Sequence, residues 1–167
     1  MFRELRRKKQ ELPPEESMDI LRKGTSGVLA LSGHEGYPYA VPISYVYLDS
    51  KLYFHGAKTG HKIDAIKRQD KASFCVIAQD KVIPEKYTTA YRSVIVFGRI
   101  RIIEEEAEIK KALEALAVKY HPNGDEAGRQ REVEKFRETL CMMELDIEHI
   151  CGKEGLELLK ERQQDGQ

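Results

Sequence analysis

The feature that most constrains the fold is a succession of β-rich segments with only turn residues between them. Segments 27–32, 37–48 and 51–54 are rich in aliphatic, β-branched and aromatic residues. Antiparallel strands can be joined by a short turn, whereas parallel strands need a crossover of about a dozen residues or more. The three segments are therefore expected to form an antiparallel meander. Pro38 and Pro42 each remove a backbone donor, so we expect them at an edge, a bulge or a ligand.

Three later segments bring the count to about six strands. They are residues 72–78, 91–103 and 143–147, and a polar loop is expected between the first of them and Pro84. In the longest segment alternate positions share one face, as in a strand with one buried side. The positions on that face are Val94, Val96, Gly98, Ile100 and Ile102. The chain is thus expected to be an α+β domain built on an antiparallel sheet that curls into a small barrel.

Capping residues and helical periodicity mark the segments that flank the sheet. Ser17 can cap a short helix that ends at Gly24. A second short helix follows the glycine-bearing loop before His61, and two longer helices lie on either side of the break 121–125. Helices are expected at residues 18–23, 61–69 and 105–120, in a charged segment that carries Val133, Phe136 and Leu140, and at residues 155–162.

Composition excludes several classes of protein. The 167 residues suit a single domain, 1–167, with a charged leader at 1–16 and a C-terminal tail at 154–167. Lys and Arg together number 28, as do Asp and Glu, and this balance argues against nucleic-acid binding, which needs excess positive charge. No apolar run approaches the roughly 20 residues that span a bilayer. Three cysteines are too few for a disulfide scaffold, so a cytoplasmic location is expected.

One segment is locally cationic despite the overall neutrality. Residues 57–71 carry five Lys or Arg against two Asp. Gly60 allows a helix to begin sharply, which exposes free N–H groups at its positive end, and Lys62 lies in the first turn. Together these features are typical of a phosphate site. A solvated helix after a turn is the ordinary alternative, because the Gly-x-x-x-Gly-x-Lys pattern is loose.

Two further positions could carry chemistry. His55 ends an apolar strand beside this loop, and an imidazole can donate a proton near neutral pH, although a structural histidine is common there. Tyr91-Arg92-Ser93 opens the long strand with a cation and two hydroxyls, where Arg92 could simply pair with a carboxylate. The histidine and cysteine spacing predicts no metal site. The sequence also lacks the Gly-x-Ser-x-Gly elbow that is typical of serine hydrolases.

Four motifs resemble one known family, in the expected order. The run 53–64 (YFHGAKTGHKID) and the run 91–98 (YRSVIVFG) resemble the two signatures of the nitroimidazole-resistance (Nim-type) branch of the pyridoxamine 5'-phosphate oxidase-like flavoproteins. Residues 41–47 and 147–153 resemble flanking motifs of that branch. The resemblance covers about residues 24–153. One departure is Cys151, where the family pattern has Thr before the glycine, and this leaves contacts from the last strand open.

The resemblance implies a six-stranded FMN-binding split barrel that forms a homodimer, with FMN in two clefts at the interface. Lys62 and the backbone of Gly60 and His61 would hold the phosphate, assisted by Arg92 and Ser93. Residues 42–45 would line the isoalloxazine ring. The full set implied to bind FMN is Pro42, Ile43, Ser44, Tyr45, His55, Gly56, Ala57, Gly60, His61, Lys62, Arg92, Ser93 and Val94.

The implied activity is that of an FMN-dependent oxidoreductase. It would reduce nitroaromatic or similar electron-poor small molecules, with His55 as a catalytic proton donor and NADH or NADPH as the electron donor. Pyridoxamine or pyridoxine 5'-phosphate oxidation is an alternative, disfavoured because residues 161–167 contain no arginine-rich segment for a second phosphate. A non-enzymatic flavin- or haem-binding protein is another, with His34, His121 or His149 as candidate haem ligands.

Overall fold

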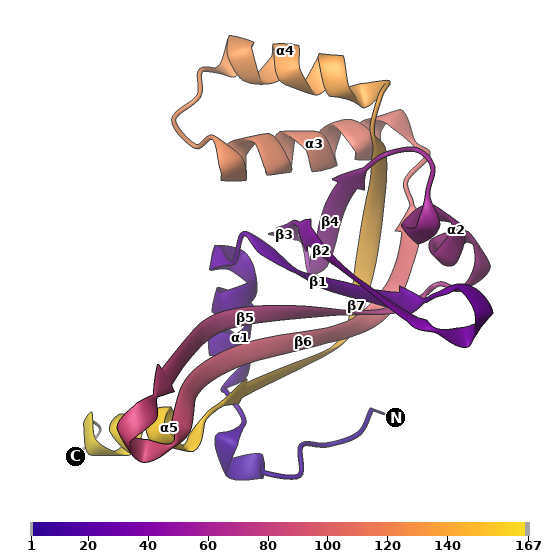
Figure 1. Cartoon of the computed structure of the whole chain (residues 1–167). Coiled ribbons are helices and arrows are strands. Elements are labelled where there is room, and N and C mark those ends of the chain that lie inside the picture. Colours follow the sequence, from indigo (N-terminus) through magenta and orange to yellow (C-terminus); the bar gives the residue numbers. More distant parts are fainter. Residues whose placement is uncertain (1, 166–167) are drawn as a thin grey trace.

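The computed structural model describes residues 2–165, which form one seven-stranded antiparallel sheet and five α-helices (Figure 1). The sheet order is β2-β1-β5-β6-β7-β4-β3. The strands are β1 (Ser26–Ser32), β2 (Pro38–Ser44), β3 (Val46–Leu48), β4 (Lys51–Gly56), β5 (Lys71–Ile83), β6 (Thr88–Ile102) and β7 (Cys141–Glu154). The helices are α1 (Pro14–Lys23), α2 (His61–Arg68), α3 (Glu106–Tyr120), α4 (Glu126–Arg137) and α5 (Leu156–Asp165). The α+β class and the antiparallel sheet are confirmed.

The sheet has seven strands where the sequence predicted six, because the segment 37–48 divides at Tyr45. The two resulting strands, β2 and β3, lie at opposite ends of the sheet order although a single residue joins them. The sheet must therefore curl until its two edges meet at Tyr45. No ladder pairs β2 with β3 in the part of the chain that the structure describes, so the curled sheet remains open.

Strand pairing departs from the expected meander. β1 pairs with β2 and β3 pairs with β4, but β4 then lies against β7, with His55 opposite Met142. The expected polar loop before Pro84 is strand instead, because β5 continues to Ile83 and pairs with β6 over that stretch. Since β2 is an edge strand, the expectation that Pro38 and Pro42 avoid a central ladder position is confirmed.

Helix ends follow local chemistry. α1 begins at Pro14, four residues before the predicted start, because proline suits the first turn of a helix. Ser17 therefore lies inside the helix, where its hydroxyl donates to the carbonyl of Pro13 at 3.3 Å rather than capping. The helix ends at Gly24 as expected. Within the described range, no helix is long and apolar enough to cross a membrane.

Two apolar clusters hold the fold together. The larger fills the inside of the curled sheet and centres on Phe74, whose ring contacts those of Tyr45 and Phe54 edge-on at centroid distances of 4.8 and 5.1 Å. The smaller lies between the α3–α4 hairpin and the β3–β4–β7 end of the sheet. Figure 1 shows the two helices stacked side by side beyond that end. The hairpin thus covers the outer surface of the sheet where His55 of β4 lies.

Candidate functional site

The loop from β4 to α2 forms a small cradle of donors. Gly60 has φ of 121°, a value that favours glycine, and it caps α2 without a side-chain hydrogen bond. Within the described residues, the backbone N–H groups of His61 and Lys62 have no hydrogen-bond partner. The Lys62 side chain lies across Gly56, where a Cβ would stand 2.6 Å from Lys62 Cε. The glycine therefore makes room for an ammonium group beside free N–H donors, and this donor set suits a phosphate.

The predicted local positive charge is confirmed for part of this segment. Lys58, Lys62 and Lys67 have no carboxylate within 4.0 Å among the residues described. Arg68 has a structural role, because its guanidinium donates to the carbonyls of Ser32 and Gly33 at 2.8 and 2.7 Å. Lys58 and Lys62 are therefore available to an anionic ligand near the cradle, while Lys67 lies in the last turn of α2, away from it.

His55 lies beside the cradle on the opposite face of β4 from Gly56. Burial lowers the pKa of its imidazole, and the nearby positive charge of Lys62 lowers it further. The ring is consequently neutral at neutral pH and can accept a hydrogen bond at one nitrogen and donate at the other. Ser44, at the end of β2, faces the same space as His55.

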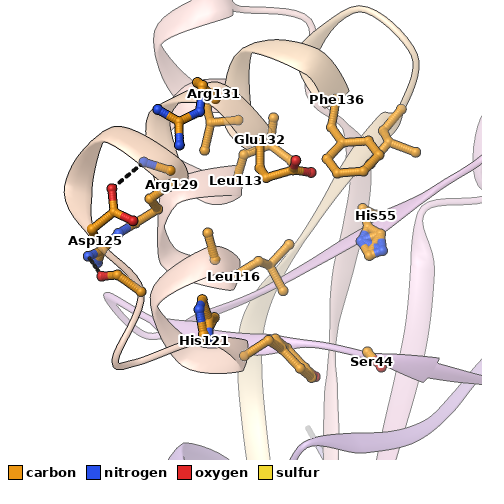
Figure 2. Close-up of a pocket in the computed structure, with 16 residues that line it drawn as sticks. Ser44, His55, Leu113, Leu116, His121, Asp125, Arg129, Arg131, Glu132 and Phe136 are labelled. Atoms are coloured by element: carbon orange, nitrogen blue, oxygen red, sulfur yellow. Dashed lines mark hydrogen bonds between the residues drawn. The ribbon is translucent and has the colours of Figure 1, made fainter.

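That space is a cavity of about 660 Å³ beneath the α3–α4 hairpin (Figure 2). Its walls are mostly apolar, and His55 and Ser44 form one end of it. The apolar lining comes from Leu113, Leu116, Ala117, Val133, Phe136 and Leu140. The sequence indicated an apolar face on these helices but not where that face lies, because the sheet order that positions the hairpin depends on long-range strand pairing.

The predicted ring-binding residues 42–45, at the end of β2 and just beyond it, divide into two groups. Pro42 and Ser44 are exposed, whereas Ile43 is half-buried against the core. Tyr45 is fully buried, and its hydroxyl donates to Leu21 O at 2.7 Å. Its backbone is occupied as well, because its N–H donates to Tyr120 Oη at 3.1 Å and its carbonyl accepts from Lys119 at 3.0 Å. The structure therefore leaves Pro42 and Ser44 accessible but uses Tyr45 to hold the fold.

Arg92, Ser93 and Val94 lie far from the cradle within one copy of the chain. They pair with the last residues of β7, whereas β4 pairs with its first residues. Ile102 of β6 marks the cradle end of the sheet, because it pairs with Met143, which pairs with Phe54 of β4. Arg92 lies ten positions before Ile102, roughly 33 Å away along the strand. Figure 1 shows α5, which follows β7, and α2 at opposite ends of the sheet. Arg92 Nε contacts the buried carboxylate of Glu154 at 3.1 Å, and the Val94 side chain is buried in the core.

The other predicted or candidate residues are dispersed. The His61 ring stacks on Tyr39 at a centroid distance of 4.0 Å and so docks α2 against β2, while Ala57 is exposed in the loop. His149 stacks on the ring of Phe2, and His121 lines the cavity end opposite His55. No group of three or more His, Cys, Asp or Glu that could hold a metal ion occurs in the range 2–165.

Solved structures share this fold at low sequence identity. A candidate 5-nitroimidazole antibiotic resistance protein from Bacteroides thetaiotaomicron matches with TM-score 0.71 and 18% identity, over 86% of this chain and 85% of that one. Conserved hypothetical protein Rv2991 from Mycobacterium tuberculosis matches with TM-score 0.79 and 16% identity, over 93% and 92%. The FAD- and haem-binding protein from Mycobacterium smegmatis matches with TM-score 0.73 and 24% identity, over 89% and 74%.

Sequence comparison places the chain more specifically. No curated protein matches the sequence. A family model described as Pyridoxamine 5'-phosphate oxidase matches residues 13–154, which include β1 to β7, the cradle and the cavity. The resemblance inferred from the sequence motifs is thereby confirmed at the level of the family. This chain belongs to the pyridoxamine 5'-phosphate oxidase family.

Proposed function

We propose that this protein is an FMN-dependent oxidoreductase that reduces electron-poor small molecules, nitroaromatic compounds among them, as a homodimer. One observation carries the proposal: a cradle of unpaired donors suited to a phosphate follows β4, and His55, on the opposite face of that strand from Gly56, lines an apolar cavity. The family match and the structural likeness to the candidate 5-nitroimidazole resistance protein support it.

The cradle would hold the phosphate of FMN. Lys62 supplies the positive charge, and the N–H groups of His61 and Lys62 supply hydrogen bonds aligned with the positive end of α2. Lys58, in the same loop, adds positive charge to the surroundings. A Cβ at Gly56 would meet the flexible end of the Lys62 side chain and shift its ammonium group, so glycine leaves that group its place in the cradle.

The ring end of the cofactor would lie beside Pro42, Ser44 and His55. A bound flavin supplies two-electron reduction of an acceptor placed against its ring. The chain's own groups provide the surroundings: apolar side chains exclude water, Ser44 offers a hydroxyl, and the neutral imidazole of His55 offers an N–H that can donate a hydrogen bond to the acceptor. This is the role assigned to His55.

A second copy fits the open face of the sheet. Val28, Cys75, Ile95 and Cys151 lie directly opposite one another across β1, β5, β6 and β7, and the row is only partly buried. Ile77, 64% exposed, extends this apolar face. Ser93 shares this face of β6 with Ile95 at the end far from the cradle, and Arg92 is its neighbour on the other face, so we assign both to the site of the second copy.

Purified protein tests the proposal. A flavin absorption band that co-purifies with the chain, and that releases FMN on denaturation, is expected. Lys62→Ala should lose most of this flavin, whereas Lys67→Ala, a matched change on the exposed part of the same helix, should keep it. Anaerobic oxidation of NADH or NADPH with 2-methyl-5-nitroimidazole as acceptor then tests the reaction. A wild-type protein that neither co-purifies with nor takes up FMN contradicts the proposal.

A further inference from the structure

We propose that the cavity beneath the α3–α4 hairpin is the substrate-binding chamber, and that it selects a planar aromatic molecule bearing an oxygen acceptor on its ring. The oxygen would be that of a carbonyl or carboxylate group, separate on the ring from the group that is reduced at the His55 end. The inference rests on the proposed function for the reaction at the His55 end, but the binding of such a molecule is a separate property of the hairpin.

The chamber has the dimensions and the chemistry of a small-molecule site. Its volume of about 660 Å³ falls in the range of ligand pockets, which are typically lined by apolar side chains with a few polar groups. Leu116 projects into it from α3, and the Phe136 ring faces it from α4 (Figure 2). An aromatic molecule can pack between an aliphatic side chain and an aromatic ring, and this favours a flat ligand.

Arg129 provides the polar end of the chamber. Its side chain is 19% exposed, and one terminal nitrogen donates to the carbonyl of Gly124 at 2.9 Å. Its Nε atom is buried without a hydrogen-bond partner, whereas Nη1 makes no hydrogen bond among the described residues and is not buried. A guanidinium cannot lose its charge in a protein, so the accessible N–H groups of Nη1 can take an acceptor from a ligand. An oxygen atom on the ligand would supply it.

The two ends of the chamber are distinct. His55 and Ser44 lie at one end, while Arg129, His121 and Asp125 lie at the other (Figure 2). A ligand whose oxygen reaches Arg129 therefore presents its opposite edge to His55. The chamber thus selects for the position of the oxygen substituent as well as for the flat ring.

The chamber is built rather than formed by a loose gap between helices. Asp125 caps α4 by accepting from the N–H of Gly128 at 2.7 Å, which fixes the turn beside Arg129. At the other end of that turn, Lys119 and Tyr120 hydrogen-bond the backbone of Tyr45 and tie α3 to the junction of β2 and β3. Both ends of the hairpin turn are thereby anchored.

Calorimetric titration of the full chain, freed of flavin, tests the chamber with 4-nitrobenzoate and nitrobenzene as probes. Ala117→Phe fills the cavity from α3 and should abolish binding of both. Val118→Phe, the neighbouring change on the exposed side of α3, should leave binding unchanged. Phe136→Ala, a truncation of a side chain that is 37% exposed, should weaken both probes by about tenfold. It provides the same test if Ala117→Phe fails to fold.

Arg129→Gln tests the polar end of the chamber. The wild-type chain should bind 4-nitrobenzoate more tightly than nitrobenzene, and the variant should lose most of that difference. Lys62→Ala should bind the probes like wild type while losing flavin, so failure of the chamber and failure of the cofactor site are distinguishable. Absence of binding to wild type, or equal binding by Ala117→Phe, would overturn the proposal.

Discussion

Tyr120→Phe removes one hydroxyl that ties α3 to the curled sheet. Tyr120 Oη accepts from the N–H of Tyr45 at 3.1 Å and contacts two carbonyls, those of Thr25 and Tyr45. Tyr45 is fully buried, so its N–H would be left with one long contact of 3.4 Å to Thr25 O. A buried donor left without any partner costs about 1–3 kcal/mol, and because this N–H keeps a weaker one we expect a loss near the lower end of that range. For a chain of this length that corresponds to a fall in Tm of about 2–4 °C per kcal/mol.

Urea unfolding followed by circular dichroism measures this loss. Tyr47→Phe is the matched control, because Tyr47 is half-buried and its hydroxyl has no hydrogen bond within residues 2–165. We expect the control to lie within about 0.5 kcal/mol of wild type. A Tyr120→Phe variant as stable as that control would refute the claim that this hydroxyl joins α3 to the β2–β3 junction.

Three further predictions concern stability and its pH dependence. Phe74→Ala should cost about 3–5 kcal/mol in urea unfolding, because the fully buried ring contacts two other rings, and a loss below about 1 kcal/mol would argue against this core. Burial raises the pKa of Glu144, but hydrogen bonds from Lys51 and Arg101 outweigh burial and hold it below 4.5. Its stabilisation is therefore present above that value, so Glu144→Gln should be about 1.5–3 kcal/mol less stable at neutral pH, and the gap should close as pH falls through the folded-state pKa. The pKa of His55 lies below 6.5 in the folded chain, so the unfolded chain binds the proton first and stability should fall as pH drops below that value. Unfolding of wild type and His55→Asn at a series of pH values should show this component only in wild type, and parallel curves would contradict it.

Local sequence patterns predicted much of the fold. The alternation in β6, the loop at Gly60 and the break at 121–125 are properties of neighbouring residues, so short segments reveal them. The division of segment 37–48 at Tyr45 depends instead on contacts with Tyr120 and Lys119, which lie more than seventy residues away in the chain. No pattern within the segment itself marks that break.

The same distinction applies to the site. The cradle is made by consecutive residues, and the sequence placed Gly56, Gly60 and Lys62 together because they lie in one loop. The chamber needs β4 to lie beside β7 rather than in a meander, since only that order brings His55 under the α3–α4 hairpin. Arg92 was grouped with Lys62 by motif, and strand register places it at the far end of the sheet.

The central claim is that the β4–α2 cradle holds a flavin phosphate. The most direct measurement is the flavin absorption of equal amounts of purified wild-type, Lys62→Ala and Lys67→Ala protein, after saturation with FMN and removal of the unbound cofactor. The account predicts a full flavin band for wild type and Lys67→Ala and a nearly colourless Lys62→Ala protein that is as stable as flavin-free wild type. Equal flavin content in all three proteins would contradict it.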